Sequence, residues 1–242
     1  MNEQKIDFVL FAGDQVYCDM PRNYFGVSTP LPISKVSYKA YCKKSFKAFK
    51  QNSFRKLTSS LPAYMIFDDH EIKNDWGFYK CLDSDGVEIP GEIKALESGF
   101  RCYQAYQANH GPSVDLSQIS HSPDTYKPLG KKHYYSFSCG NSGYFVLDVR
   151  SQREKPDEQG LSKMISDEQF DELKAWTNGT GIRDGKDAKV KFIVSPVPLL
   201  PDVKGGLHLG SPNDIWTGYP KQRQELLQPG YEKKHILFFS GD

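Results

Sequence analysis

Four short apolar runs in this chain each end in aspartate, and no other feature constrains the fold as strongly. The runs are Phe8 to Asp14, Tyr64 to Asp69, Tyr144 to Asp148 and Ile236 to Asp242. Their length and their β-branched and aromatic content predict buried strands. The aspartates then lie at the carboxyl ends of the strands, where open α/β sheets bind their ligands. We therefore expect an α/β fold with one cleft rimmed by carboxylates.

Several anions gathered in one cleft repel one another and raise each other's pKa values. A positive charge between them removes this repulsion, and a metal ion is the simplest source of that charge. The pattern of strands ending in aspartate therefore predicts a metal site.

The length and charge of the chain limit the classes of protein to which it can belong. We expect one large domain over residues 1–242, because no linker-like segment interrupts the sequence. The 31 Lys and Arg residues nearly cancel the 30 Asp and Glu residues, so the net charge of +1 gives no footprint for nucleic acid or an anionic membrane. No apolar stretch approaches the roughly 20 residues needed to cross a bilayer. We expect a soluble chain, and the sequence leaves its compartment and oligomeric state open.

The hydrophobic pattern predicts alternating helices and strands. Helices are expected at 34–61 (one or two), 91–110 and 170–177, and strands after the first one at 63–67, 133–138, 144–148 and 190–194. A short Gly-containing connection between 133–138 and 144–148 predicts an antiparallel hairpin, so the sheet should be mixed. The sequence from Ser166 to Gln169 matches a capping box at a helix start. The five cysteines are scattered without a C-x-x-C pair, which argues against a disulfide framework or structural zinc.

The first strand is followed by the sequence G-D-Q-V-Y, which begins at Gly13. Glycine lets the backbone turn sharply, and Asp14 and Tyr17 are close enough to converge on one ion. A phenolate is formed readily only beside a strongly Lewis-acidic ion, so a tyrosine ligand favours Fe³⁺ over Mg²⁺ or Ca²⁺. The alternative is a loop aspartate that caps the next segment, beside a buried tyrosine.

The second strand is followed by a dense polar segment, from Asp68 to Asp75. Carboxylates and the amide oxygen of Asn74 suit a hard divalent ion. His70 can act as a ligand or as a proton donor to a leaving group. A structural histidine held by a carboxylate is the alternative, but the density of ionisable groups directly after a buried strand favours a functional site.

These residues belong to a set of four motifs that occur in order along nearly the whole chain. The motifs are G-D-Q-V-Y at Gly13, D-D-H-E-x-x-N at Asp68, L-D-x-R-x-x-R at Leu147 and S-G-D at Ser240. Together they resemble the PhoD-type alkaline phosphatases (alkaline phosphatase D), a branch of the calcineurin-like metallophosphoesterases. The resemblance implies a four-layer α/β/β/α sandwich with mixed sheets and a metal cluster at the strand ends.

The resemblance also assigns metal ligands residue by residue. Asp14 would bridge two metals, and Tyr17 would bind an iron-like ion. Asp69 occupies the position of a ligand in the wider superfamily, Asn74 is a further ligand candidate, and Asp242 matches the aspartate of the final G-D-x-H motif. We expect Fe³⁺ with Ca²⁺, with Mn²⁺ or other divalent ions as alternatives.

Two catalytic residues follow from the same resemblance. His70 would be the catalytic histidine that protonates the leaving alkoxide, and Arg150 would hold phosphate oxygens. For Arg150, a structural ion pair with Asp148 is an equally weighted alternative, as it is for Arg153.

The chain departs from the family pattern at both ends. The cysteine ligand that precedes the first motif has no counterpart, and the histidine after the last Gly-Asp is missing. We therefore expect a domain truncated at both ends that binds its metals less tightly. Relatives are often exported through a twin-arginine signal, which the chain given does not show.

We predict a metal-dependent phosphoesterase that hydrolyses phosphomonoesters or phosphodiesters by attack of a metal-activated water. Its expected partner is a small-molecule phosphate ester. Two alternatives remain open: a non-catalytic or degenerate metal-binding domain of the same fold, and a carboxyl esterase that uses the same carboxylates.

Overall fold

The computed structural model describes residues 5–19, 36–110, 133–200, 214–228 and 235–241. All four runs that end in aspartate form strands, as expected. They are β1 (Val9–Ala12), β2 (Ala63–Ile66), β4 (Ser142–Val146) and β6 (Ile236–Ser240). The sequence therefore located the strands that carry the candidate site, and each strand ends within two residues of its expected boundary.

The strands form two sheets in the described part of the chain. In the first, β1 and β2 pair in parallel. The second has the order β3-β4-β5-β6, where β3 is Tyr135–Cys139 and β5 is Val190–Ser195. The β3–β4 pair is antiparallel, whereas β4–β5 and β5–β6 are parallel. The expected hairpin and the mixed sheet are thus confirmed.

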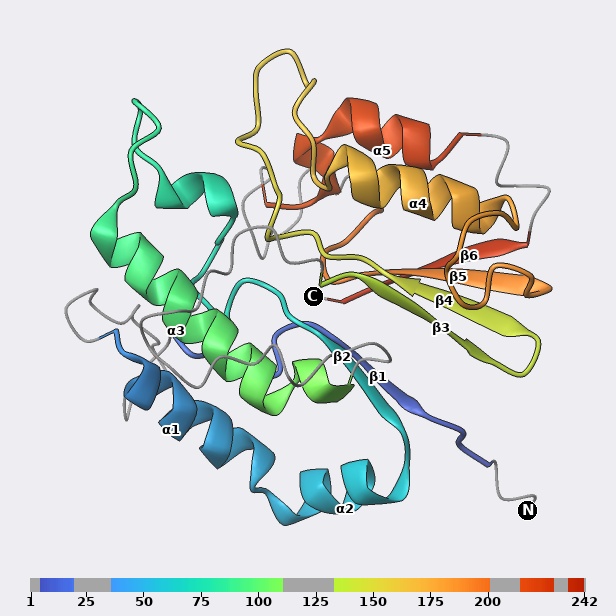
Figure 1. Ribbon diagram of the computed structural model, residues 1–242, viewed down its shortest axis with the longest axis horizontal. Helices are drawn as coiled ribbons and strands as arrows, with labels where there is room; N and C mark the ends of the chain where they lie inside the picture. Colours follow the sequence, from blue (N-terminus) through green and yellow to red (C-terminus); the bar gives the residue numbers. More distant parts are fainter. Residues whose placement is uncertain (1–4, 20–35, 111–132, 201–213, 229–234, 242) are drawn as a thin grey trace.

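Helices cover the two sheets from opposite sides (Figure 1). The first group is α1 (Tyr38–Phe49), α2 (Asn52–Ser60) and α3 (Pro90–Tyr106), and the second is α4 (Asp167–Thr177) and α5 (Pro220–Leu226). Short 3-10 helices are η2 (Phe78–Cys81), η3 (Ala108–His110) and η5 (Trp216–Gly218). The segment 34–61 thus holds two helices, and α5 was not anticipated. No helix in the described ranges has the length and hydropathy to span a membrane.

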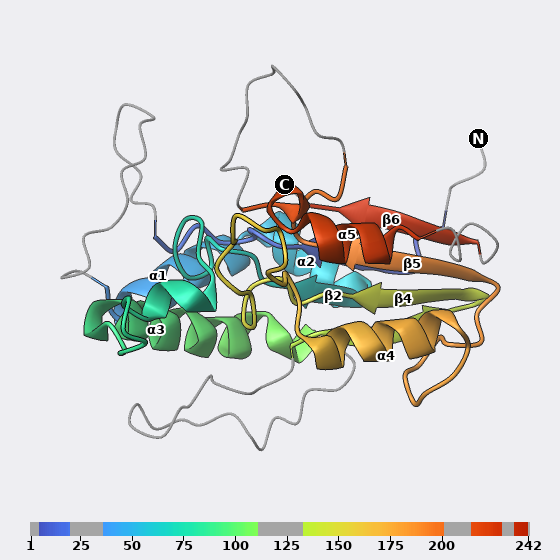
Figure 2. The ribbon, with the colours of Figure 1, turned by 90° about the horizontal axis from the view of Figure 1, so that it is seen from above.

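Three apolar clusters hold these layers together. One lies under α4 and α5 and includes Phe145, Ile193 and Trp176. Another joins the two sheets and α3, through residues such as Ile66 and Val146. The third fills the space between α1 and α3. In Figure 1 the order across the molecule is α1 to α3, the two sheets, and then α4 and α5, which is consistent with the expected sandwich; Figure 2 shows the same elements turned by 90°.

The expected capping box at α4 is only half formed. The Ser166 side chain accepts a hydrogen bond from the backbone N of Gln169 (3.2 Å), as predicted. The Gln169 side chain does not bond back to Ser166, because it is fully buried and bonds both the backbone N and the backbone O of Asp148 at 2.9 Å. Gln169 therefore ties α4 to the end of β4 instead of completing the cap.

Candidate metal centre at the strand ends

The carboxyl ends of strands from both sheets meet at one place, and two glycines permit the close approach. Gly13, after β1, has φ of +104°, and a Cβ there would lie 2.6 Å from Asp68 Cβ and 3.3 Å from Pro196 Cβ. A Cβ on Gly241, after β6, would collide with the carbonyl oxygens of Ala12 and Pro196. The loops that follow β1, β2, β5 and β6 thus pack backbone against backbone, which brings their polar residues together.

Replacing Gly13 with alanine should therefore be costly. We expect Gly13→Ala to lower the free energy of unfolding by roughly 3 kcal/mol, from left-handed strain plus overpacking against Asp68. Gly86→Ala is the matched control, since Gly86 also has positive φ (+76°) but nothing within 4 Å of the added Cβ. Its cost should be about 1 kcal/mol. Urea denaturation of both variants measures the difference, and equal costs would contradict the close packing at Gly13.

Asp14, Asp69 and His70 form the candidate metal-binding group. One ligand atom from each lies within 4.8 Å of the other two. Asp14 has φ of +55°, an uncommon conformation for a residue other than glycine, and its carboxylate accepts a hydrogen bond from the backbone N of His70 (3.3 Å). Burial, then the neighbouring anions Asp68, Asp69 and Glu71, raise the pKa of Asp14 to about 8. This is the electrostatic penalty that a bound cation relieves.

The donor set fits a hard or borderline metal ion. Carboxylate oxygens and one imidazole nitrogen suit Fe, Mn or Zn, and carboxylate oxygens suit Ca²⁺. A second acidic group, Asp69, Asp75 and Asp214, also has ligand atoms within 4.8 Å of one another. Asp69 belongs to both groups. The prediction that the strand ends gather carboxylates able to hold metal is therefore supported by the geometry.

Glu71 holds the two site loops together. Its carboxylate accepts hydrogen bonds from the backbone N of Asp68 (2.9 Å), Asp14 (3.2 Å) and Val16 (3.3 Å), and from Gln107 Nε2 (3.0 Å). Burial raises the pKa of Glu71 to about 7, although these hydrogen bonds oppose the shift. The glutamate of the D-D-H-E motif, Glu71, therefore binds backbone amides, and these bonds fix the loop after β1 against the loop after β2.

His70 is held by a carboxylate that the sequence analysis did not single out. His70 Nδ1 lies 2.9 Å from Asp19 Oδ1, and the other oxygen of Asp19 accepts a hydrogen bond from the backbone N of Asn74 (2.8 Å). The Tyr17 ring lies against the His70 ring, with centroids 4.1 Å apart. Burial lowers the pKa of His70, but the bond to Asp19 and the anions around it prevail and raise it to about 9. Asp19 has no local signature, because its partner is 51 residues away.

The Tyr17 ring thus lies against His70, and the backbone N of Asn74 shares the Asp19 carboxylate with His70. About half of the Tyr17 side chain is exposed, and Asn74 is half-buried. Asp242, the fifth expected ligand, lies outside the described residues.

Arg150 is buried in a network of ion pairs. Its Nε contacts Asp68 Oδ1, its Nη1 and Nη2 both contact the Asp214 carboxylate, and Nη1 also donates to Trp76 O (3.0 Å). Arg153 Nη1 contacts Asp214 Oδ1 at 2.6 Å, and Arg150 Nη1 contacts the same oxygen. Burial lowers the pKa of Arg150, but Asp68 and Asp214 outweigh this and hold it well above the usual range. The geometry favours the structural alternative, with Asp68 and Asp214 as the partners.

Asp148 is not the ion-pair partner of Arg150. Its buried carboxylate accepts hydrogen bonds from the backbone N of Arg150 (3.1 Å) and Ser151 (3.0 Å), and from the Ser151 hydroxyl. Asp148 therefore shapes the turn after β4. The ion-pair role expected of Asp148 belongs to Asp214, which no sequence motif indicated.

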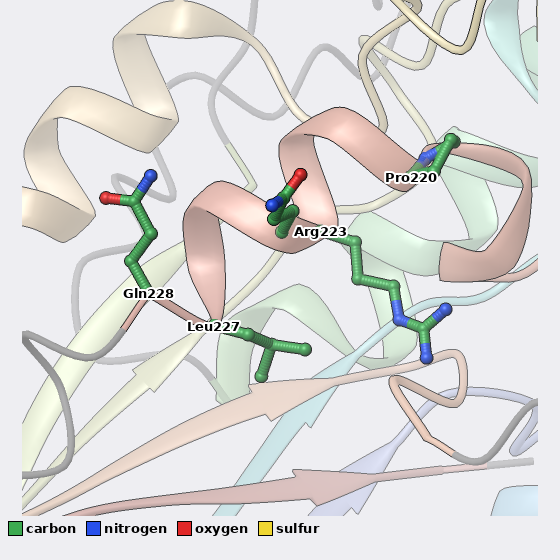
Figure 3. A pocket seen from close by; sticks show the side chains of 5 residues that line it. Pro220, Arg223, Leu227 and Gln228 are labelled. Carbon is green, nitrogen blue, oxygen red and sulfur yellow. The ribbon is translucent and has the colours of Figure 1, made fainter.

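A surface pocket elsewhere on the molecule is not this site. It is lined by Pro220, Arg223, Gln224, Leu227 and Gln228 of α5 and the residues that follow it (Figure 3). It contains none of the strand-end carboxylates, so we assign it no part in the chemistry.

The two-sheet α/β scaffold gathers carboxylates and a histidine at its strand ends, a donor set that can hold metal ions. The sequence profile of one family matches all of residues 1–242, and the chain therefore belongs to the PhoD-like phosphatases. This confirms the resemblance seen in the motifs.

The fold is similar to that of a solved structure described as "Structure of PhoD", with a TM-score of 0.67 and 17% sequence identity. The match covers 99% of this chain and 46% of that chain, so the chain spans less than half the length of its structural relative. At this identity the likeness supports the fold alone. No curated protein matches the chain.

Proposed function

We propose that this chain is a metal-dependent phosphoesterase that hydrolyses phosphomonoesters or phosphodiesters. The observation that carries the proposal is the convergence of two carboxylates, Asp14 and Asp69, with the imidazole of His70, all within 4.8 Å of one another. Membership of the PhoD-like phosphatase family supports the same reaction class.

The chain's own oxygen donors would hold the metals. We assign Asp14, Tyr17, Asp69, Asn74 and Asp242 as ligands, with Fe³⁺ and Ca²⁺ as the favoured ions and Mn²⁺ as an alternative. When bound, the metals would supply positive charge against the phosphate oxygens and a water molecule of lowered pKa as the nucleophile. The position of Tyr17 against the His70 ring supports its place at the same site.

His70 would protonate the leaving oxygen. His70 Nδ1 is engaged by Asp19 Oδ1 at 2.9 Å, so the imidazolium would donate its Nε2 proton to the leaving oxygen. Asp19 is then a positioning residue, and its second oxygen is held by the backbone of Asn74.

For Arg150 we propose a positioning role as well. Its guanidinium is 1% exposed and already contacts Asp68 and Asp214, while Nη2 lies 3.6 Å from Asp69 Oδ1. This arrangement orients the carboxylates after β2. It leaves little of the guanidinium to bind phosphate oxygens directly.

Hydrolysis of phosphate esters with different leaving groups tests both the reaction and the role of His70. The wild-type chain, treated with chelator and then reloaded with Fe³⁺, Ca²⁺ or Mn²⁺, is expected to hydrolyse p-nitrophenyl phosphate or bis-p-nitrophenyl phosphate only with metal. His70→Asn should lower turnover of a simple alkyl phosphate by about 10² to 10⁴-fold, because an alkoxide needs a proton to depart. It should lower turnover of the nitrophenyl esters far less, because nitrophenolate leaves without one.

His235→Asn is the control, because His235 is exposed and precedes β6 at the end remote from the strand-end carboxylates. Its φ of +50° is a conformation that asparagine also adopts. Its turnover should equal that of the wild type. Equal losses on all esters for His70→Asn would make His70 a metal ligand instead of an acid. A folded, metal-loaded wild-type chain with no turnover of any ester would refute the proposed function and favour a metal-binding domain.

A further inference from the structure

Two of the five cysteines lie next to each other, away from the candidate metal centre. Cys42 is on α1 and Cys102 is on α3, and their sulfur atoms are 3.2 Å apart. Cys102 is buried in the apolar cluster between these helices, and the partly buried Cys42 packs against that cluster. All five cysteines are free thiols in the structure.

We propose that Cys42 and Cys102 are a redox-convertible pair that closes to a disulfide linking α1 to α3. Bonded sulfur atoms are about 2.0 Å apart. The thiols must therefore approach by about 1 Å, starting from a separation of 3.2 Å at which they are already in contact. None of the other three cysteines has a sulfur partner among the hydrogen bonds and contacts of the described residues.

The oxidant we name is a small-molecule disulfide, and the reaction is thiol–disulfide exchange. Cys42 is half-buried whereas Cys102 is 2% exposed, so the Cys42 thiolate meets the oxidant first. It forms a mixed disulfide and releases one thiol of the oxidant. The Cys102 thiolate then attacks Cys42 Sγ, releases the second thiol and forms the protein disulfide. The two cysteines lose two electrons and two protons, and the oxidant gains both.

Burial of Cys102 agrees with this order of events. Removal from water raises the pKa of the Cys102 thiol strongly, which makes it a poor nucleophile toward a free oxidant. Attack on a mixed disulfide at Cys42 is different, because the two sulfur atoms are already held in contact.

The helix pair also supports the loops of the candidate metal centre. From α1, the Tyr41 hydroxyl donates to Ile72 O (2.6 Å) and Lys44 Nζ donates to Cys18 O (2.6 Å). A bond between α1 and α3 would fix this support, and it would join positions 60 residues apart in the chain. Closing a loop of that length restricts the unfolded chain and so stabilises the fold.

Oxidation of the full chain by oxidised glutathione, in the absence of metal, tests the proposal without reference to enzymatic activity. We expect peptide mass spectrometry, after blocking with N-ethylmaleimide, to show one Cys42–Cys102 cross-link. The melting temperature by circular dichroism should rise by roughly 5 to 10 °C relative to the chain in dithiothreitol.

Cys42→Ser should show no such rise, and Cys139→Ser, at the end of β3, should show all of it. Cys42 is the better position for the variant because it is less buried than Cys102. A glutathione adduct at Cys42 without the cross-link would overturn the proposal. So would equal melting temperatures for the oxidised and reduced wild-type chain.

Discussion

Replacing Asp14 with asparagine is expected to lower kcat/KM for metal-dependent phosphoester hydrolysis by about 10³-fold, or roughly 4 kcal/mol of transition-state stabilisation. The amide keeps the shape of the side chain and can still accept the hydrogen bond from the backbone N of His70. It lacks the charge that a bridging ligand supplies. The loss should therefore be one of metal affinity and catalysis, and the fold should persist.

Compared with the wild type, Asp14→Asn should be at least as stable without metal and less stable with metal. Without metal, Asp14→Asn removes repulsion from Asp68, Asp69 and Glu71, so its melting temperature should equal or exceed that of the wild type. With Mn²⁺ at about 100 times its Kd, the wild type should gain roughly 2.7 kcal/mol, which the variant should not gain.

Asp171→Asn is the matched control for Asp14→Asn. Asp171 is on α4, its side chain is 70% exposed and it pairs only with Lys174 among the ion pairs of the described residues. This variant should keep both the metal response and the activity. If Asp14→Asn kept the full response to Mn²⁺, Asp14 would not be a metal ligand.

Removing the buried guanidinium of Arg150 is expected to cost about 3 to 5 kcal/mol of stability. Arg150→Ala leaves the carboxylate of Asp68 without a cation at 2% exposure, and it removes one of the two arginines that pair with Asp214. A loss of this size is a large fraction of the stability of an ordinary domain. Urea denaturation of Arg150→Ala and the wild type measures it.

A second substitution distinguishes the loss of charge pairing from the loss of packing. Adding Asp68→Asn to Arg150→Ala removes the uncompensated carboxylate, so the double variant should be more stable than Arg150→Ala alone. Lys174→Ala breaks the exposed pair with Asp171 and should cost no more than about 1 kcal/mol. An equally small cost for Arg150→Ala would show that the buried network contributes little.

Much of the fold could be predicted from the sequence, because the signals for strands and helices are local. Apolar runs such as Phe8 to Asp14 mark buried strands, and the helical spacing of apolar residues marks α1 and α3. Parallel strands end at the same edge of a sheet. Two apolar runs that each end in aspartate therefore predicted that Asp14 and Asp69, and with Asp69 its neighbour His70, would lie close together. Their ligand atoms are within 4.8 Å of one another.

Hydrogen-bond partners could not be predicted in the same way. Gln169 is three residues after Ser166, as a capping box requires, yet its side chain bonds Asp148. A buried amide needs both a donor and an acceptor, and the end of β4 offers both at once. The local pattern therefore identified the start of α4, and tertiary packing determined where the Gln169 side chain went.

The sequence by itself determined the class of fold, the strands that carry the site, and most of the groups that meet there. Only the tertiary structure decided that Asp19 holds His70, that Glu71 binds backbone amides, and that Asp68 and Asp214 pair with Arg150. The physical reason is the difference in range. Periodicity acts over a few residues, whereas a buried charge must find its partner wherever folding brings one within reach, here 51 to 82 residues away for Asp19 with His70 and for Asp68 with Arg150.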